Sequence, residues 1–164
     1  MKNIILFLVL LCSSPLFAQK SIDKLLAKYN VNSVPYITPQ ELAMPKTEVV
    51  LLDSRELKEY KTSHLKNAIH VGYNHFKIHK VETLIPDKNA EIVVYCSVGI
   101  RSESIGDSLK KAGYSNVKNL YGGIFEWKSN DFPVYNAIEK ETDSIHTFNK
   151  VWSKWLKKGI KVYE

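Results

Sequence analysis

The chain reads IVVYCSVGIRS from Ile92 to Ser102. Its first four residues are apolar and typical of a buried strand, and Cys96 follows at the end of that strand. From Cys96 to Arg101 runs a six-residue loop in which Gly99 can adopt a backbone conformation closed to other residues. Such a loop can curl so that its backbone N–H groups point at the sulfur and form an anion-binding nest. We therefore predict that Cys96 lies in a site built for negative charge.

The residues after the loop predict a helix from about Ser102 to Ala112. The positive end of its dipole would favour thiolate over thiol at Cys96. A thiol with a pKa of about 8.5 is only a few per cent ionised at pH 7, whereas a pKa two units lower would ionise roughly three quarters. We predict that Cys96 is a nucleophile. The alternative, a buried and inert cysteine at a strand end, is common for this residue type, but the loop that follows argues against it.

The loop resembles the active-site loop of the rhodanese family of sulfurtransferases, whose single-domain members carry Cys-x-x-Gly-x-Arg-Ser between a central strand and a helix. Two further regions are similar to family motifs: LLDSRELKEY at 51–60 with HLKNAIHV at 64–71, and LYGGIFEW at 120–127 with FPV at 132–134. Three motifs in the family's order are far more specific than one Cys-x-x-x-x-Arg. Ser63 and Asn67 stand where the family usually has glycine, and asparagine can partly imitate glycine because it tolerates left-handed backbone.

The resemblance implies an α/β fold of the rhodanese-like, three-layer type, with helices on both faces of a central parallel sheet. The residue pattern agrees, because apolar runs alternate with helical stretches. We expect strands at 34–37, 49–52, 68–71, 91–95 and 117–120, the first at a sheet edge because it contains Pro35. We expect helices at 21–29, from Thr38 onward, at 56–61, within 74–85, at 102–112 and at 122–129. Ligands of such sheets bind at the carboxyl ends of strands, where Cys96 falls.

The first eighteen residues predict a secretory signal peptide. Lys2 precedes an apolar run from Ile4 to Leu11, which is far shorter than the ~20 residues that span a bilayer. The small residue Ala18 predicts cleavage there, which would make the mature protein periplasmic or secreted. The alternative is a lipoprotein attached through Cys12, but Leu11 stands where a lipid-attachment signal requires a small residue.

Removal of residues 1–18 would leave a rhodanese-like domain with its lead-in at 19–136 and a C-terminal extension at 137–164. Cys96 is then the one remaining cysteine, so the protein has no disulfide framework although its compartment would permit one. The formal net charge is +6, and +5 without Lys2. Lysines concentrate near the C-terminus, and we expect a solvated face there, with binding of anionic surfaces or substrates as the alternative. Nucleic acid is not an expected partner outside the cytoplasm.

The C-terminal extension carries apolar residues at helical spacing: Val151, Trp152, Trp155, Leu156 and Ile160. This spacing predicts an amphipathic helix whose aromatic face packs on the domain. The alternative is a helix on a membrane surface, because the opposite face is rich in lysine. We expect packing on the domain and no membrane contact.

The resemblance assigns roles to the loop residues. It implies a catalytic Cys96 and a substrate-binding loop formed by Ser97, Val98, Gly99, Ile100, Arg101 and Ser102. Arg101 is expected to close the loop by binding carbonyls or a nearby carboxylate, while adding positive charge near the anion. Hydroxyls of Ser97 and Ser102 are candidate donors to the site, although Ser102 can equally be a helix-start residue. Asp53 and Arg55, one strand over, are expected to frame the active-site loop.

Three histidines raise the question of a metal site. His75 and His79 have the i,i+4 spacing of helical zinc ligands, and His70 is close in sequence. The sequence places no cysteine or acidic ligand beside them, so we expect ordinary surface or hydrogen-bonded histidines. We predict no metal and no other cofactor.

The reaction that the resemblance implies is sulfur transfer. The Cys96 thiolate would attack the outer sulfur of a donor such as thiosulfate, expel sulfite and hold a persulfide, which cyanide or a thiol of a small molecule or protein then removes. A phosphatase relative has a loop one residue longer, so the loop here favours sulfur. Arg101 is the loop's only formal positive charge, less than a dedicated thiosulfate site would offer. The alternative is a non-enzymatic module that carries sulfur or binds a partner protein.

Overall fold

The computed structural model describes residues 15–45 and 48–163 of the 164-residue chain. Most of the predicted signal peptide, including Cys12, lies outside the described residues. Ala18, where cleavage is predicted, lies in helix α1 (Pro15–Tyr29), which begins before the helix expected at 21–29. Within the described part of the chain, no helix is both long and apolar enough to cross a membrane.

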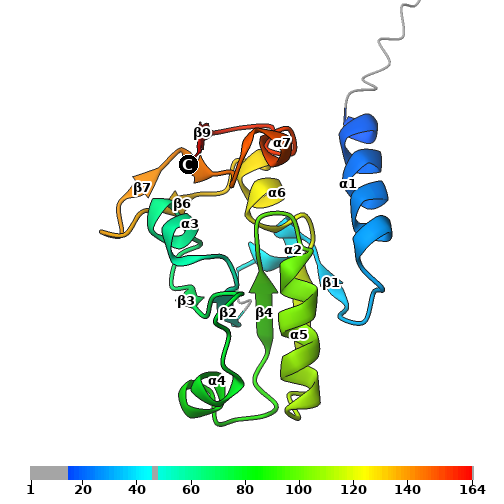
Figure 1. Ribbon diagram of the computed structural model, residues 1–164, viewed down its shortest axis with the longest axis vertical. Helices are drawn as coiled ribbons and strands as arrows, with labels where there is room; N and C mark the ends of the chain where they lie inside the picture. Colours follow the sequence, from blue (N-terminus) through cyan, green and yellow to red (C-terminus); the bar gives the residue numbers. More distant parts are fainter. Residues whose placement is uncertain (1–14, 46–47, 164) are drawn as a thin grey trace, which may run out of the picture.

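Five parallel strands form the central sheet, in the order β1-β5-β4-β2-β3. In that order the strands are β1 (Tyr36–Ile37), β5 (Val117–Leu120), β4 (Ile92–Tyr95), β2 (Val50–Asp53) and β3 (Ile69–His70). The predicted strands are confirmed, with shorter bounds at both sheet edges. The strand before Cys96 is central, and the predicted edge strand β1 lies at one edge (Figure 1).

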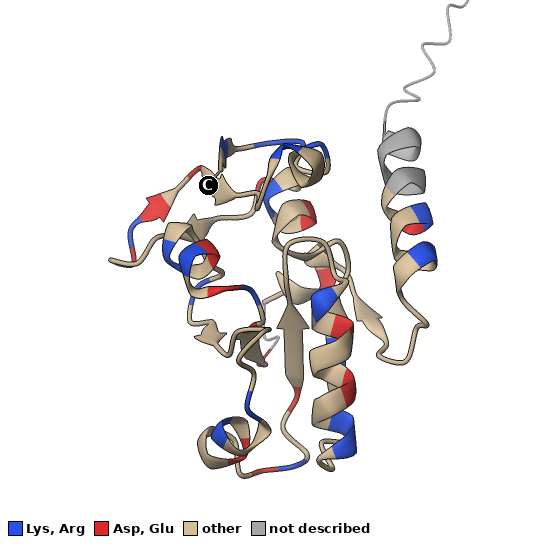
Figure 2. Cartoon of the chain, in the orientation of Figure 1, with Lys and Arg blue, Asp and Glu red and all other residues tan. Residues whose placement is uncertain are grey.

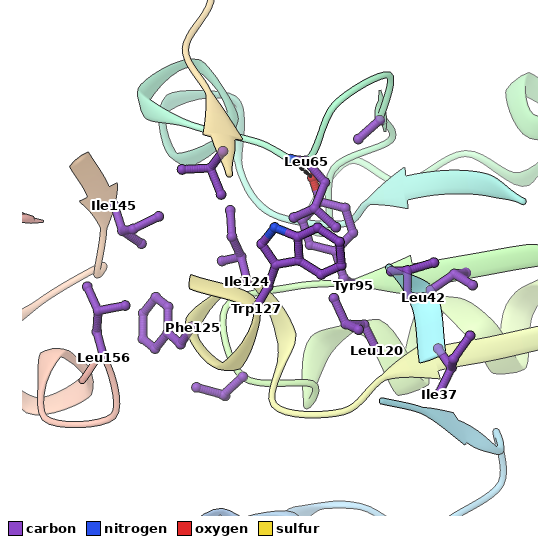
Figure 3. Close-up of a cluster of buried hydrophobic side chains, with 14 of the residues drawn as sticks. Ile37, Leu42, Leu65, Tyr95, Leu120, Ile124, Phe125, Trp127, Ile145 and Leu156 are labelled. Atoms are coloured by element: carbon purple, nitrogen blue, oxygen red, sulfur yellow. Dashed lines mark hydrogen bonds between the residues drawn. The ribbon is translucent and has the colours of Figure 1, made fainter. Parts of the chain in front are cut away.

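Helices cover both faces of this sheet. The helices that connect its strands are α2 (Pro39–Leu42), α3 (Leu57–Thr62), α4 (Ile78–Leu84) and α5 (Arg101–Lys111), and α6 (Gly123–Ser129) follows β5. Successive side chains of a strand point to opposite faces, and on β4 Ile92 and Val94 join an apolar cluster with α4 and α5. Val93 and Tyr95 join a second cluster with α2, α3 and α6, seen in Figure 3. The predicted three-layer α/β fold is confirmed.

Neighbouring residues determine two backbone features. Thr38 caps α2 through the backbone N–H of Glu41, and the Glu41 carboxylate accepts from the backbone N–H of Thr38, which completes a capping box. Asn67 adopts a left-handed backbone with φ of 61°, as expected for a residue that replaces glycine. Ser63 has an extended backbone that any residue adopts.

The prediction of an amphipathic helix in the C-terminal extension is wrong. In the extension, β7 (Glu141–Thr142) pairs with β6 (Val134–Tyr135), which lies just before the extension, and β8 (Ser144–His146) pairs with β9 (Ile160–Val162). Between β8 and β9 lies only a four-residue helix, α7 (Lys150–Ser153), capped by Asn149. Gly159, with φ of 102°, turns the chain into β9, and a Cβ there would lie 2.9 Å from the backbone oxygen of Asp143.

Apolar residues of the extension nevertheless pack on the domain. Leu156 is 1% exposed and belongs to the same cluster as Phe125 of α6, and Figure 3 shows these two side chains facing each other. Trp152 and Trp155 are partly buried against that cluster. Val151 and Ile160, which the helical pattern also predicted to be buried, are 66% and 62% exposed.

Candidate active site

Cys96 follows directly on the carboxyl end of the central strand, where the sequence predicted it. Its Sγ accepts a hydrogen bond of 3.1 Å from the backbone N–H of Gly99, so the loop turns an N–H group toward the sulfur. Cys96 is only 1% exposed, but it lines a cavity of about 260 Å³ at the surface of the protein. The sulfur is therefore buried on the protein side and faces a space that can hold a ligand.

Hydrogen bonds from two asparagines fix the conformation of the loop at Gly99. The carbonyl of Gly99 accepts from Nδ2 of Asn119, at 2.8 Å, and from Nδ2 of Asn30, at 2.9 Å. The φ of Gly99 is 99°, and a Cβ would also lie 3.4 Å from the side chain of Leu26 in α1. Asn30, directly after the lead-in helix α1, and Asn119 of β5 thus fix the backbone at Gly99, whose N–H lies beside the sulfur.

The start of α6 binds the carbonyls at the other side of the loop. The N–H groups of Ile124 and Phe125 donate to the carbonyls of Cys96 and Ser97, at 2.9 and 3.1 Å. Gly123 makes this approach possible, because its φ is 56° and a Cβ would lie 2.3 Å from the carbonyl oxygen of Cys96. The contact explains why the Gly-Gly motif belongs to the site although it is distant in sequence.

Arg101 closes the loop by binding a carboxylate, which is one of the two predicted possibilities. Its Nη1 and Nη2 donate to Oε2 and Oε1 of Glu59, each at 2.8 Å, and Nη2 also donates to Oγ of Ser97, at 3.0 Å. Burial raises the pKa of Glu59, but the hydrogen bonds and positive charge of Arg101 outweigh it and lower this pKa to about 2. The charge of Arg101 is therefore compensated by a buried carboxylate, which the sequence analysis did not single out.

The electrostatic surroundings favour the Cys96 thiolate. Burial alone would raise the pKa of Cys96, but the positive charge of Arg101 and hydrogen bonds from Ser102 and from the backbone N–H of Val98 lower it overall. The first turn of α5 adds the positive end of a helix dipole at the same place. These surroundings thus favour the nucleophilic, thiolate form of the sulfur.

Ser97 and Ser102 have different positions in the structure. The Oγ of Ser97 donates to Glu59, at 3.0 Å. The Oγ of Ser102 lies 3.5 Å from Sγ of Cys96 and 2.7 Å from Oδ1 of Asn119. Ser102 is the second residue of α5 rather than its cap, so its hydroxyl serves the site and not the helix start.

Asp53 and Arg55 lie outside the cavity lining. They form a fully buried ion pair of 2.6 Å between Oδ2 and Nη2, and Nη2 of Arg55 also donates to the carbonyl of Ser63. The Arg55 guanidinium lies 5.7 Å from the ring centroid of Tyr95, the residue before Cys96. The pair thus supports the end of the central strand.

The cavity has a second wall that the sequence analysis did not predict. The loop contributes Ser97, Val98, Ile100 and Arg101 beside Cys96. Tyr73, Phe148 and Trp152 bring three aromatic side chains to the same cavity, the last two from the C-terminal extension. In Figure 1 the extension, orange to red, lies at the end of the sheet to which the β4 arrow points. These aromatic residues show no motif in the sequence, and only the fold brings them to Cys96.

The three histidines do not share a helix. His75 lies in the loop before α4 and His79 lies within α4, and both are exposed. The ring Nε2 of His70 is 2.9 Å from the carbonyl oxygen of Arg55. No group of three or more potential metal ligands occurs among the residues that the structure describes.

Comparison with known proteins identifies the family. A family model for the rhodanese-like domain matches residues 38–130, more than half of the chain. The chain belongs to the rhodanese-like domain family. The match ends before Phe148 and Trp152, so these two cavity residues of this rhodanese-like protein lie beyond the matched region.

Rhodanese-like relatives include proteins of two kinds. A tRNA uridine(34) hydroxylase of Aster yellows witches'-broom phytoplasma is 35% identical over 99 residues, which cover 56% of this chain and 32% of that protein. The chain thus spans about a third of the hydroxylase. The thiosulfate sulfurtransferase GlpE of Coxiella burnetii is 31% identical over 84 residues, which cover 51% of this chain and 76% of that protein.

Solved structures share the fold. A thiosulfate sulfurtransferase from Pseudomonas aeruginosa matches with a TM-score of 0.58 and 24% identity, over 73% of this rhodanese-like chain and 23% of that one. The BH2092 protein from Bacillus halodurans matches with a TM-score of 0.56 and 19% identity, over 73% of this chain and 86% of that one. At these identities the likeness concerns the fold.

Proposed function

We propose that this chain is an exported sulfurtransferase that moves sulfane sulfur from a donor, such as thiosulfate, to a thiol or cyanide through a persulfide on Cys96. The observation that carries the proposal is the hydrogen bond of 3.1 Å from the N–H of Gly99 to Sγ of Cys96, at the inner end of an open cavity. A persulfide extends that sulfur by one atom into the cavity. Membership of the rhodanese-like domain family and the similarity to thiosulfate sulfurtransferases support this chemistry.

The reaction proceeds in two steps whose atoms and charges balance. The Cys96 thiolate attacks the outer sulfur of thiosulfate, an S–S bond forms at Cys96, and the donor's S–S bond breaks to release sulfite. The outer sulfur keeps a negative charge, which the loop N–H groups and the start of α5 stabilise. A cyanide or thiolate then attacks this outer sulfur and leaves with it as thiocyanate or as a new persulfide, which restores the Cys96 thiolate.

Steady-state formation of thiocyanate from thiosulfate and cyanide tests the proposal. We expect turnover by the wild-type chain and by Cys12→Ser, and none above the uncatalysed rate by Cys96→Ser. A single stoichiometric transfer without turnover would instead support the sulfur-carrier alternative. Equal turnover by Cys96→Ser would exclude the mechanism.

Export is a second part of the proposal and rests on the sequence of residues 1–18. We expect the mature protein to begin at Gln19 and to carry no lipid. N-terminal sequencing of protein recovered from the native compartment tests this, and a chain that keeps residues 1–18, or an acylated Cys12, would contradict it.

A further inference from the structure

The cavity beside Cys96 combines a polar reaction centre with an apolar, aromatic wall. At the centre lie the sulfur and the start of α5. Ile100 and Tyr73 lie on the cavity's lining together with Phe148 and Trp152. An inorganic ion such as thiosulfate has no apolar group for such a wall to bind.

The position of Phe148 is enforced by the backbone. Its φ is 63°, a left-handed conformation that a bulky residue rarely adopts and that costs free energy. The N–H of Asn149 donates to the carbonyl of Thr147, at 2.7 Å, which closes a tight turn around Phe148. Pairing of β8 with β9 holds one side of the turn, and α7 follows on the other. Phe148 is thereby held at the cavity while 47% of it remains exposed.

Trp152 is held at the cavity by packing. It is partly buried against the apolar cluster of the domain, and its ring centroid lies 6.5 Å from that of Tyr29 in α1. The apolar cluster and α1 thus place this indole beside the active-site loop. The aromatic wall is part of the folded domain and not a loose tail.

The charge of the site does not match a dianion. The two hydrogen bonds from Arg101 to Glu59 compensate its positive charge with a carboxylate that is 2% exposed. The other loop residues are uncharged, and Figure 2 shows the ribbon between β4 and α5 in tan. Glu56, which also lines the cavity, adds a negative charge rather than a positive one. What remains to bind a negative group is the set of backbone N–H groups and the helix dipole, which suits one negative charge better than two.

The size of the cavity also favours a ligand larger than thiosulfate. Its volume of about 260 Å³ approaches the range of about 300–1,000 Å³ that is usual for sites of organic small molecules. Thiosulfate has five non-hydrogen atoms and would leave much of this space, including the part beside the aromatic wall, unfilled. A sulfur compound with an organic substituent would fill it.

We propose that the cavity selects an organic sulfur compound whose apolar substituent packs against Phe148 and Trp152, in preference to inorganic thiosulfate. The natural form of this class is an organic persulfide, R–S–SH, together with the thiol that it becomes. The inference rests on the proposed sulfur transfer through Cys96 and specifies its substrate class. The Cys96 thiolate attacks the outer sulfur of R–S–SH, the S–S bond breaks, and R–S⁻ leaves while the proton stays on the transferred sulfur. In the reverse step the thiolate R–S⁻ takes the outer sulfur from the Cys96 persulfide. The donor and the acceptor therefore share one binding mode.

Organic thiosulfonates provide matched probes. Benzenethiosulfonate and methanethiosulfonate both carry one negative charge and the same reacting group, and they release a sulfinate when the thiolate takes their outer sulfur. We would measure kcat/KM for both, and for thiosulfate, with cyanide as acceptor. We expect a preference of at least about tenfold for the benzene compound, because the phenyl group buries apolar surface that methyl lacks.

Variants locate the cause of that preference. In Phe148→Ala we expect the ratio of kcat/KM for benzenethiosulfonate to kcat/KM for methanethiosulfonate to fall by about 3–10-fold. Comparing this ratio between variant and wild type cancels any intrinsic difference in reactivity between the two donors. Phe148→Tyr keeps the ring and should keep the ratio. Val151→Ala, which alters an exposed neighbour, should leave it unchanged. A ratio that Phe148→Ala and Trp152→Ala both leave unchanged would overturn the inference, as would a wild-type preference for thiosulfate.

A binding measurement separates this inference from the proposed reaction. The Cys96→Ser variant cannot form a persulfide, and sulfinate binding to it can be measured by tryptophan fluorescence. We expect benzenesulfinate to bind this variant at least about tenfold more tightly than methanesulfinate does. If no donor is turned over but this difference in binding is present, the sulfur-transfer reaction is wrong and the assigned cavity specificity stands. Equal binding of the two sulfinates would overturn the specificity whatever the outcome for turnover.

Discussion

The guanidinium of Arg101 and the carboxylate of Glu59 face each other through two hydrogen bonds of 2.8 Å each. The pair joins the end of the active-site loop to α3, which is 42 residues earlier in the chain. It fixes the loop around Cys96 and compensates the charge that would otherwise attract anions.

Replacing Glu59 by Gln should lower the free energy of unfolding at neutral pH. The pKa of Glu59 falls from 4.5 to about 2 on folding, which corresponds to on the order of 3 kcal/mol. Because the folded-state pKa is the lower one, this contribution is present above about pH 4.5 and is lost as the pH falls toward 2. Urea unfolding of wild type and Glu59→Gln across this range should give curves that converge at low pH. A constant gap would contradict the assignment.

Replacing Arg101 by Gln should shift the reactivity of Cys96 to higher pH. The positive charge of Arg101 helps to lower the pKa of Cys96 below 9.0, so the wild-type thiolate forms at lower pH than an ordinary cysteine. Alkylation of Cys96 by iodoacetamide, followed by mass spectrometry of its peptide, reports the thiolate. We expect the midpoint for Arg101→Gln at higher pH, and that for Arg101→Lys between the two. Coincident profiles for all three proteins would refute the role of this charge.

Replacing Gly123 by Ala should disrupt the loop. A Cβ there would lie 2.3 Å from the carbonyl oxygen of Cys96 and 2.7 Å from the backbone of Ser97, which cannot move away cheaply. Gly113 is the matched control, because it also has a positive φ but a Cβ would meet nothing within 4 Å. Gly113→Ala should cost about 1–2 kcal/mol from strain alone. Gly123→Ala should cost more in urea unfolding and should lose sulfur uptake at Cys96.

Replacing Leu156 by Ala should destabilise the whole domain. Leu156 is 1% exposed in the cluster that contains α6, and such a truncation costs about 2–5 kcal/mol. For a chain of this length the melting temperature should fall by at least about 4 °C. Val151→Ala, at a position 66% exposed, should change stability by less than about 0.5 kcal/mol. Similar melting curves for both variants would show that the extension does not stabilise the domain.

Local patterns in the sequence predict much of the fold. A parallel strand covered on both faces must be apolar throughout, so the apolar run before Cys96 predicts a buried strand. The structure confirms that this strand, β4, is buried and central. The capping box at Thr38 and the left-handed Asn67 are properties of neighbouring residues. In the same way, the position of Cys96 at a strand end and the need for a glycine at position 99, whose φ is positive, can be predicted from the loop sequence.

The parts that could not be predicted depend on contacts between distant residues. Glu59 meets Arg101, and Asn30 meets Gly99, only because the sheet brings their elements together. In the extension, bulky residues at helical spacing suggested a helix, but the pairing of β8 with β9 determines the backbone instead. The position of Phe148 in the aromatic wall depends on that pairing, so no local pattern in the sequence predicts it.

Mass spectrometry of the peptide that contains Cys96, after incubation with a sulfane-sulfur donor, tests the central claim most directly. We predict that this peptide gains one sulfur atom with benzenethiosulfonate or thiosulfate. Cyanide should remove that sulfur as thiocyanate, and dithiothreitol should also reverse the gain. A Cys96 peptide that gains no sulfur from either donor, in a chain that still forms thiocyanate, would contradict the account.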